Sequence, residues 1–279
     1  DVAPSRGLGD VYKRQDKDFQ NLMHVYMDAV FYPDIYKQDK TFRQEGWSYK
    51  LDDPDGELTI SGVVYNEMKG AYSSPEGVLD REIQSSLFTD TTYAVDSGGD
   101  PEVIPQLTYE QFLDFHRKYY HPSNSYIYLY GDMDMEEKLA FLDEHYLSHF
   151  DYLDVDSVIQ EQKAFGACQD VTLEYPVAEN EGEEDNTYLS YNMVVGNAAD
   201  SQMAMAFEVL DYALLSAPGA PLKQALLDVK AGKDVYGSYD DGILQPYFTV
   251  IAKGSNPDRK EELVSVIRQV LGCLLYTSP

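Results

Sequence analysis

Two parts of the sequence repeat the same order of elements. In each part, a strand-like segment leads through a glycine-bearing turn into a capped amphipathic helix: SYIYLYGD before MDMEEKLAFLDEHYL, and PYFTVIAKG before SNPDRKEELVSVIRQVL. Strands followed by helices, with hairpin-like neighbours, favour an α+β sandwich over a doubly wound sheet. Because identity between the two parts is low, common α/β units explain the repeat without duplication. Duplication of a domain is the alternative and more specific explanation.

Apolar periodicity and capping residues predict the remaining elements. The sequence Thr108-Tyr-Glu-Gln is a capping box that opens a helix, and Pro75 suits the first turn of a helix capped by the preceding serine. Helices are predicted from residue 16 to about 30, from a segment containing Glu67 to about 87, and over 108–120, 135–150, 201–215, 221–227 and 257–271. Strands are predicted over 57–64, 125–132, 171–175, 188–195, 235–239 and 247–252.

The two ends differ from the rest of the sequence. Residues 1–15, DVAPSRGLGDVYKRQ, show neither helical nor strand periodicity. The end, CLLYTSP, interrupts the last helical pattern. Both strings resemble translated adapter sequence, and a frayed terminus is the alternative explanation. We predict that residues 1–15 and 272–279 are non-native tails and that the chain is an internal fragment.

The composition limits the classes of partner. Hydrophobic residues make up 43% of the chain, enough for a buried core. The formal net charge of −28 disfavours nucleic acid and membrane partners, and no apolar run approaches the ~20 residues of a membrane span. This acidity suits cationic, unfolded peptides, although solubility alone explains it equally well. The two cysteines form no disulfide framework, which fits a reducing compartment and predicts a cytoplasmic protein.

The histidines do not form a recognisable zinc motif. A catalytic zinc site needs three protein ligands and an open position. His145 and His149 have the i, i+4 spacing of a half-site, but Phe141 occupies the first ligand position of an inverted H-x-x-E-H motif. We therefore interpret these two as surface histidines, and His116 and His121, which flank a helix end, as structural.

Covalent catalysis and phosphate binding have no sequence support. The chain contains no G-x-S-x-G motif, and neither cysteine lies in a catalytic setting. Residues 97–100, Ser-Gly-Gly-Asp, lack the lysine of a phosphate-binding loop. We predict that they form a tight turn.

Glu67 is the candidate metal ligand. A glutamate on a helix is usually a solvated surface residue. Here, in GVVYNEMKG, helical spacing places Val63, Glu67 and Gly70 on one side. An anionic carboxylate beside apolar residues favours a cationic partner, and a lysine or arginine would serve as well as a metal ion.

Three longer stretches resemble the presequence-protease branch of the pitrilysin/insulinase zinc peptidases. They are GVVYNEMKGAYSSPEGVLDREIQSSLF, YAVDSGGDPEVIPQLTYEQFLDFHRKYYHPSNSYIYLYGD and AFEVLDYALLSAPGAPLKQALLD, and QEGWSYKL fits the same branch. The resemblance covers about residues 16–271. It implies a metalloendopeptidase with four α+β domains, paired into two halves that enclose a chamber for short unstructured peptides, and a monomeric parent protein.

The resemblance also implies a zinc site. The histidines of H-x-x-E-H and a glutamate on a later helix hold Zn2+ in this family, and Glu67 matches that distal ligand. The motif itself is absent from this sequence, so the fragment is expected to be inactive. A parent with a degenerate motif, acting as a structural or peptide-binding protein, is the alternative.

The resemblance finally implies a domain division. Residues 16–150 would be the later part of a first metallopeptidase domain, 151–166 a linker, and 167–271 the earlier part of a second. Both would be incomplete α/β sandwiches, with antiparallel-rich sheets and helices packed on one face.

Overall fold

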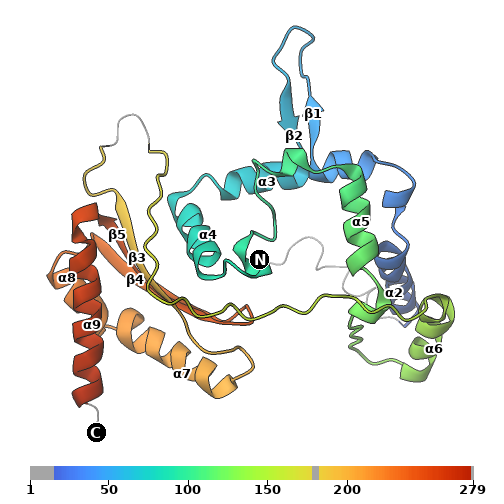
Figure 1. The fold of residues 1–279 in the computed structure, drawn as a ribbon. Helices are drawn as coiled ribbons and strands as arrows, with labels where there is room; N and C mark the ends of the chain where they lie inside the picture. Colours follow the sequence, from blue (N-terminus) through green and yellow to red (C-terminus); the bar gives the residue numbers. More distant parts are fainter. Residues whose placement is uncertain (1–15, 178–181, 278–279) are drawn as a thin grey trace. The chain divides into compact units, whose positions relative to one another are not determined.

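The computed structural model describes residues 16–177 and 182–277, with the helices and strands shown in Figure 1. The chain groups into two compact units, which are described separately. The first contains the residues up to Lys69 together with Gly98–Val158. The second contains Gly70–Ser97 and the residues from Ile159 onward.

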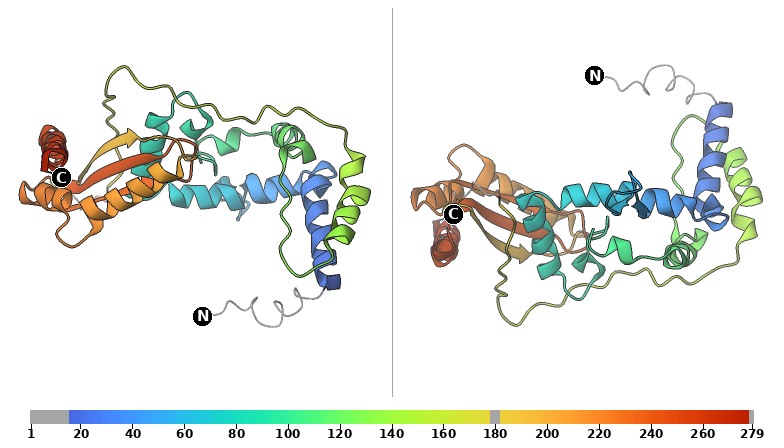
Figure 2. Two further views of the ribbon diagram at one scale, coloured as in Figure 1. Left: turned by 90° about the horizontal axis from the view of Figure 1, so that it is seen from below. Right: turned by 90° about the horizontal axis from the view of Figure 1, so that it is seen from above.

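The first unit is mainly helical. Helices α2 (Asp16–Phe31) and α6 (Met135–His145) lie side by side in both views of Figure 2 and share a core that includes Met27 and Leu142. The unit also contains α3 (Val63–Ala71), α5 (Tyr109–Tyr119) and the short helices η2 (Asp34–Tyr36), η3 (Phe42–Gly46), η5 (Ile104–Gln106), η6 (Pro122–Asn124) and η7 (Leu147–His149). The predicted helices at 16 and at 108 are therefore confirmed.

Local sequence signals fix the ends of these helices. The backbone N–H of Gln111 donates to Thr108 Oγ1 (3.2 Å), and the N–H of Thr108 donates to Gln111 Oε1 (2.8 Å). The predicted capping box is thus confirmed. Helix α3 follows a hairpin of β1 (Ser48–Lys50) and β2 (Thr59–Ser61), and Gly62 joins β2 to α3.

The second unit is built on a three-stranded antiparallel sheet. Its strands β3 (Thr187–Val194), β4 (Asp234–Asp240) and β5 (Tyr247–Ser255) are arranged in the order β3-β5-β4. Ile251 of β5 pairs with Ser190 of β3 on one side and with Tyr236 of β4 on the other. Strand β5 is therefore the centre of the sheet.

Both faces of β5 are buried. Phe248, Val250 and Ala252 share one core with residues of α8 (Pro221–Asp228) and α9 (Lys260–Thr277). Tyr247 and Ile251, on the opposite face, pack with residues of α4 (Pro75–Leu87). A strand with alternating core residues on both faces reads as a continuous apolar run, as YFTVIA does. The remaining elements of the unit are α7 (Ser201–Asp211), η8 (Tyr212–Ser216), η4 (Thr92–Ala94) and η9 (Pro257–Arg259).

Polar contacts attach α4 to the sheet. Ser74 caps the helix by accepting from the N–H of Gly77 (3.0 Å). Glu76 accepts from Tyr188 Oη (2.9 Å) and forms an ion pair with Lys253. The hydrogen bond from Lys253, and then that from Tyr188, lowers the pKa of the Glu76 carboxyl. Because these groups are largely exposed, the ion pair adds less stability than the apolar contacts beneath it.

Several element predictions are wrong. The helix predicted over 135–150 ends at His145, where α6 stops, and the separate short helix η7 follows. The strand predicted over 57–64 is limited to Thr59–Ser61, because α3 already begins at Val63. Segments 125–132 and 171–175 are not strands, because no strand in the described part of the chain pairs with them. The last helix does not end at 271, since α9 continues to Thr277. Residues 1–15 lie outside the described residues. That the two ends are non-native remains a prediction.

The α+β fold class is confirmed, because helices combine with antiparallel sheets. The prediction of helices on one face only is wrong for the sheet of the second unit, since α8 and α9 pack on one face and α4 on the other. The division into domains at 151–166 stays a prediction. Within the described ranges, no helix is long and apolar enough to span a membrane.

Candidate functional site

Glu67 lies on an open face of α3. The side chain of Glu67 is exposed, as are Val63 and Gly70, while Met68 points into the protein. A Cβ atom at position 70 would have no neighbouring heavy atom within 4 Å. Across the described residues, the Glu67 carboxylate makes no ion pair and no hydrogen bond. The carboxylate is therefore free to bind a ligand, and it lacks the lysine or arginine partner that the sequence left open.

No complete metal site is formed by the residues that the structure describes. The described ranges contain no group of three histidine, cysteine, aspartate or glutamate side chains that could hold a metal ion. Glu67 contributes one donor only. Its assignment as a metal ligand therefore stays a prediction.

His145 and His149 do not form a half-site. Helix α6 ends at His145, so His149 falls in the separate short helix η7 and the two residues do not share a helical face. Both side chains are exposed. The His145 ring packs 4.4 Å from that of Phe141, and His149 Nδ1 lies 3.4 Å from Tyr32 Oη. They are surface histidines, as predicted.

His116 and His121 have structural roles, as predicted. His121 Nδ1 accepts from the N–H of Ser123 (3.2 Å) and caps η6. The two nitrogens of His116 contact Val30 O (Nε2, 3.0 Å) and Tyr36 Oη (Nδ1, 2.7 Å). A neutral ring satisfies both contacts when Nε2–H donates and Nδ1 accepts. Burial lowers the pKa of His116, and the contact with Val30 O opposes this shift.

The lowered pKa predicts pH-dependent stability. A histidine whose pKa is lower in the folded than in the unfolded protein stabilises the fold above its unfolded pKa of about 6.5. That stability is lost as the pH falls through the folded pKa. We expect the melting temperature of the first unit to fall between pH 7.5 and 5.5, and less so in His116→Asn. His149→Asn, at an exposed position, should keep the wild-type slope. Equal slopes in all three proteins would contradict this role.

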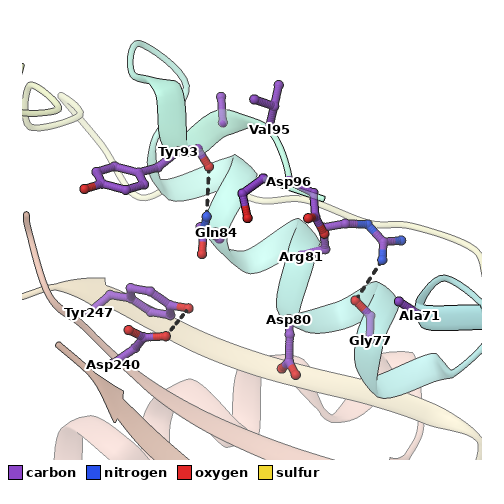
Figure 3. A pocket seen from close by; sticks show the side chains of 12 residues that line it. Ala71, Gly77, Asp80, Arg81, Gln84, Tyr93, Val95, Asp96, Asp240 and Tyr247 are labelled. Atoms are coloured by element: carbon purple, nitrogen blue, oxygen red, sulfur yellow. Dashed lines mark hydrogen bonds between the residues drawn. The ribbon is translucent and has the colours of Figure 1, made fainter. Parts of the chain in front are cut away.

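A cavity of about 390 Å³ lies beside α4 in the second unit. Figure 3 shows its lining, which comes from the end of α3, from α4, from η4 and the segment after it, and from the ends of β4 and β5. Arg81 Nη1 donates to Gly77 O (3.1 Å), and Tyr247 Oη donates to Asp240 (3.1 Å).

Charge in this cavity is mainly negative. Partial burial, reinforced by the carboxylates of Glu76 and Asp240, raises the pKa of the Asp80 carboxyl. Burial and then Asp240 raise the pKa of Tyr247. The lining contains no histidine or cysteine. Sequence reasoning missed this cavity, because α4 and β4 are about 160 residues apart and neither carries a motif.

The predicted turn at residues 97–100 is confirmed. Ser97 and Gly98 form a turn, and Gly99 has a φ of 90°. This left-handed conformation favours glycine.

Comparison with known proteins shows the family. The sequence model described as the peptidase M16 inactive domain matches residues 106–277, more than half of the chain. The protein belongs to the M16 peptidase family, and the resemblance inferred from its sequence motifs is confirmed. Glu67 lies before the matched residues.

Curated relatives include presequence proteases. Protein HypA of Clostridium perfringens is 48% identical over 268 residues, covering 96% of this chain and 28% of that protein. Presequence protease 1, chloroplastic/mitochondrial, of Arabidopsis thaliana is 39% identical over 272 residues, covering 96% and 25%. The mitochondrial presequence protease of Xenopus laevis is 34% identical over 263 residues, covering 91% and 25%. The chain thus spans about a quarter of the length of these relatives.

One solved structure that resembles this chain is described as an M16-like peptidase from Alicyclobacillus acidocaldarius. It is 18% identical, with a TM-score of 0.49, and the match covers 77% of this chain and 50% of that one.

Proposed function

We propose that this chain is part of a zinc-dependent metalloendopeptidase that degrades short unstructured peptides in an enclosed chamber, and that Glu67 is one of its zinc ligands. The observation that carries the proposal is the exposed carboxylate of Glu67, which has no partner in the described part of the chain. It is supported by the 39% identity to a protein named as a presequence protease. The net charge of −28 would attract cationic peptides.

Glu67 fits a zinc ion as a carboxylate donor, but it does not complete a site. Zinc in a catalytic site takes three protein ligands, and this sequence lacks the H-x-x-E-H motif that would supply the other two. When bound, zinc lowers the pKa of a bound water and polarises the scissile carbonyl. Within this chain, the role of Glu67 is to present its carboxylate from α3, with the side chain clear of other contacts.

The chain by itself is therefore expected to be inactive. One carboxylate does not provide the first shell that gives zinc its affinity. Incubation of the purified 279-residue chain with zinc and a quenched fluorescent peptide should give no cleavage that a chelator abolishes. Reproducible chelator-sensitive turnover would contradict this, and His145 and His149 would then be the first residues to substitute.

An alternative is a catalytically inactive homologue that binds peptides or has a structural role. The family model that matches residues 106–277 is described as an inactive domain, and Glu67 lies outside these residues. The sequence of the same gene upstream of this chain distinguishes the two functions. An intact H-x-x-E-H supports the peptidase, and its loss supports the inactive homologue.

The proposal also covers the cellular location of the protein and its oligomeric state. We propose a cytoplasmic location, because the two cysteines form no disulfide framework and therefore fit a reducing compartment. The plant and frog relatives, in contrast, are named as organellar proteins. The longer protein would be a monomer whose two halves enclose the peptide.

A further inference from the structure

The hydroxyl group of Tyr146 connects helices α2 and α6. Tyr146 directly follows α6, and its side chain is buried. Its Oη atom lies 3.0 Å from Nδ1 of His24, 2.9 Å from the backbone oxygen of His24 and 2.9 Å from Oδ1 of Asp28. His24 and Asp28 both belong to α2. One phenol group therefore contacts three polar atoms of the neighbouring helix.

The three contacts of Tyr146 share a single hydroxyl proton. Burial, and then the hydrogen bond to Asp28, raise the pKa of Tyr146 to about 12, so the phenol keeps its proton at neutral pH. An ionised carboxylate and a backbone oxygen only accept hydrogen bonds. The hydroxyl proton is therefore used for Asp28 or for the backbone oxygen of His24. The contact with Nδ1 of His24 is then favourable only when Nδ1 carries a proton of its own.

The other ring nitrogen of His24 lies near the same carboxylate. Nε2 is 3.6 Å from Oδ2 of Asp28, one helical turn further along α2. A neutral imidazole carries one proton. With this proton on Nδ1, the lone pair of Nε2 is directed to the carboxylate of Asp28. With the proton on Nε2, three acceptors surround the single O–H of Tyr146. Only the doubly protonated ring makes both contacts favourable.

Among the described residues, His145 and Tyr32 are the other titratable groups at this contact. The ring of His145, at the end of α6, lies 6.4 Å from the ring of His24, and a positive charge on it would oppose protonation of His24. Tyr32 stacks on the ring of Tyr146 at 6.0 Å. Asp28 is the nearer charge, and the interaction between charges weakens with distance. Its attraction therefore outweighs the repulsion by His145.

We infer that Tyr146, His24 and Asp28 form a pH-sensitive link between α2 and α6, which protonation of His24 strengthens. In the protonated form, Nδ1–H of His24 donates to Tyr146 Oη, the hydroxyl of Tyr146 donates to Asp28, and Nε2–H faces the same carboxylate. The added stability is present at pH 5.5 and is lost as the pH rises. Its sign is opposite to that of His116, whose neutral form stabilises the same unit.

Hydrogen exchange of the α2 and α6 amides, measured as protection relative to an unstructured peptide, tests this link. The background is His116→Asn, which removes the opposing effect. From pH 7.5 to 5.5, we expect protection in both helices to rise about 2- to 5-fold, as for a partly exposed ion pair. His24→Asn and Asp28→Asn should each abolish the rise, because neither variant can form the ion pair. His149→Asn should keep it, because His149 contacts Tyr32 instead.

Tyr146→Phe distinguishes a link between the helices from an ion pair within α2. Without the hydroxyl, a neutral His24 can carry its proton on Nε2 and donate to Asp28, so protonation adds little and the rise should disappear. An undiminished rise in Tyr146→Phe, or in His24→Asn, would overturn the inference. If Tyr146→Phe does not fold, the α6 amides decide. A rise in α6 that is lost in His24→Asn supports the link, and a rise confined to α2 refutes it.

Discussion

In the longer protein, Glu67→Gln is expected to abolish zinc binding and peptide cleavage together. The substitution keeps the shape of the side chain but removes the negative charge that balances the dication. Loss of a direct ligand should weaken binding by at least the roughly 10–100-fold that is typical of outer-shell substitutions. Metal analysis of the purified variant and a fluorescent peptide assay measure the two effects. Zinc content and turnover equal to those of the unsubstituted protein would refute the assignment of Glu67.

Two further results of the same experiment have distinct meanings. If Glu67 served only as an ion-pair partner in the longer protein, the variant would lose stability but keep about one zinc per chain. Glu144→Gln is the matched control, because Glu144 is an exposed glutamate on another helix, α6. It should leave zinc content and cleavage unchanged.

The second large effect is expected for Gly62→Ala, at the residue that precedes α3. A Cβ atom at this position would lie 2.1 Å from Gly46 O and 2.8 Å from Trp47 Cα. These neighbours are backbone atoms, so the hairpin or the start of α3 must move. Overpacking of this kind typically costs about 1–3 kcal/mol, and we expect a value near the upper end. Urea denaturation of the 279-residue chain, followed by circular dichroism, measures it.

Gly70→Ala is the control for backbone effects. Gly70 lies within α3, and a Cβ there would meet no atom within 4 Å. Alanine is favoured over glycine in a helix by about 0.5–1 kcal/mol, so this variant should be slightly more stable than the unsubstituted chain. Since Gly62 sets where α3 begins, Gly62→Ala should also reduce zinc binding in the longer protein, and Gly70→Ala should not. Similar stabilities for the two variants would show that the close approach at Gly62 is relieved at little cost.

The sequence by itself determined the features that depend on neighbouring residues. The capping box at Thr108 and the serine cap before Pro75 are present as predicted, because the groups that bond lie within three residues of one another. The helix of Glu67 and the membership of the M16 family also followed from motifs in the sequence. The residues that form each of these features lie close together in the sequence, so a short stretch of the chain is enough to recognise them.

Only the tertiary structure decided which segments find partners. The alternation in SYIYLYGD and the apolar run YFTVIA each predict a strand, yet the second is a central strand and the first is unpaired. A strand is stable only when a distant segment supplies its hydrogen bonds, and no pattern within the segment encodes that partner. The packing of α4 on β5, the cavity beside it and the open position of Glu67 likewise depend on contacts between residues far apart in the sequence.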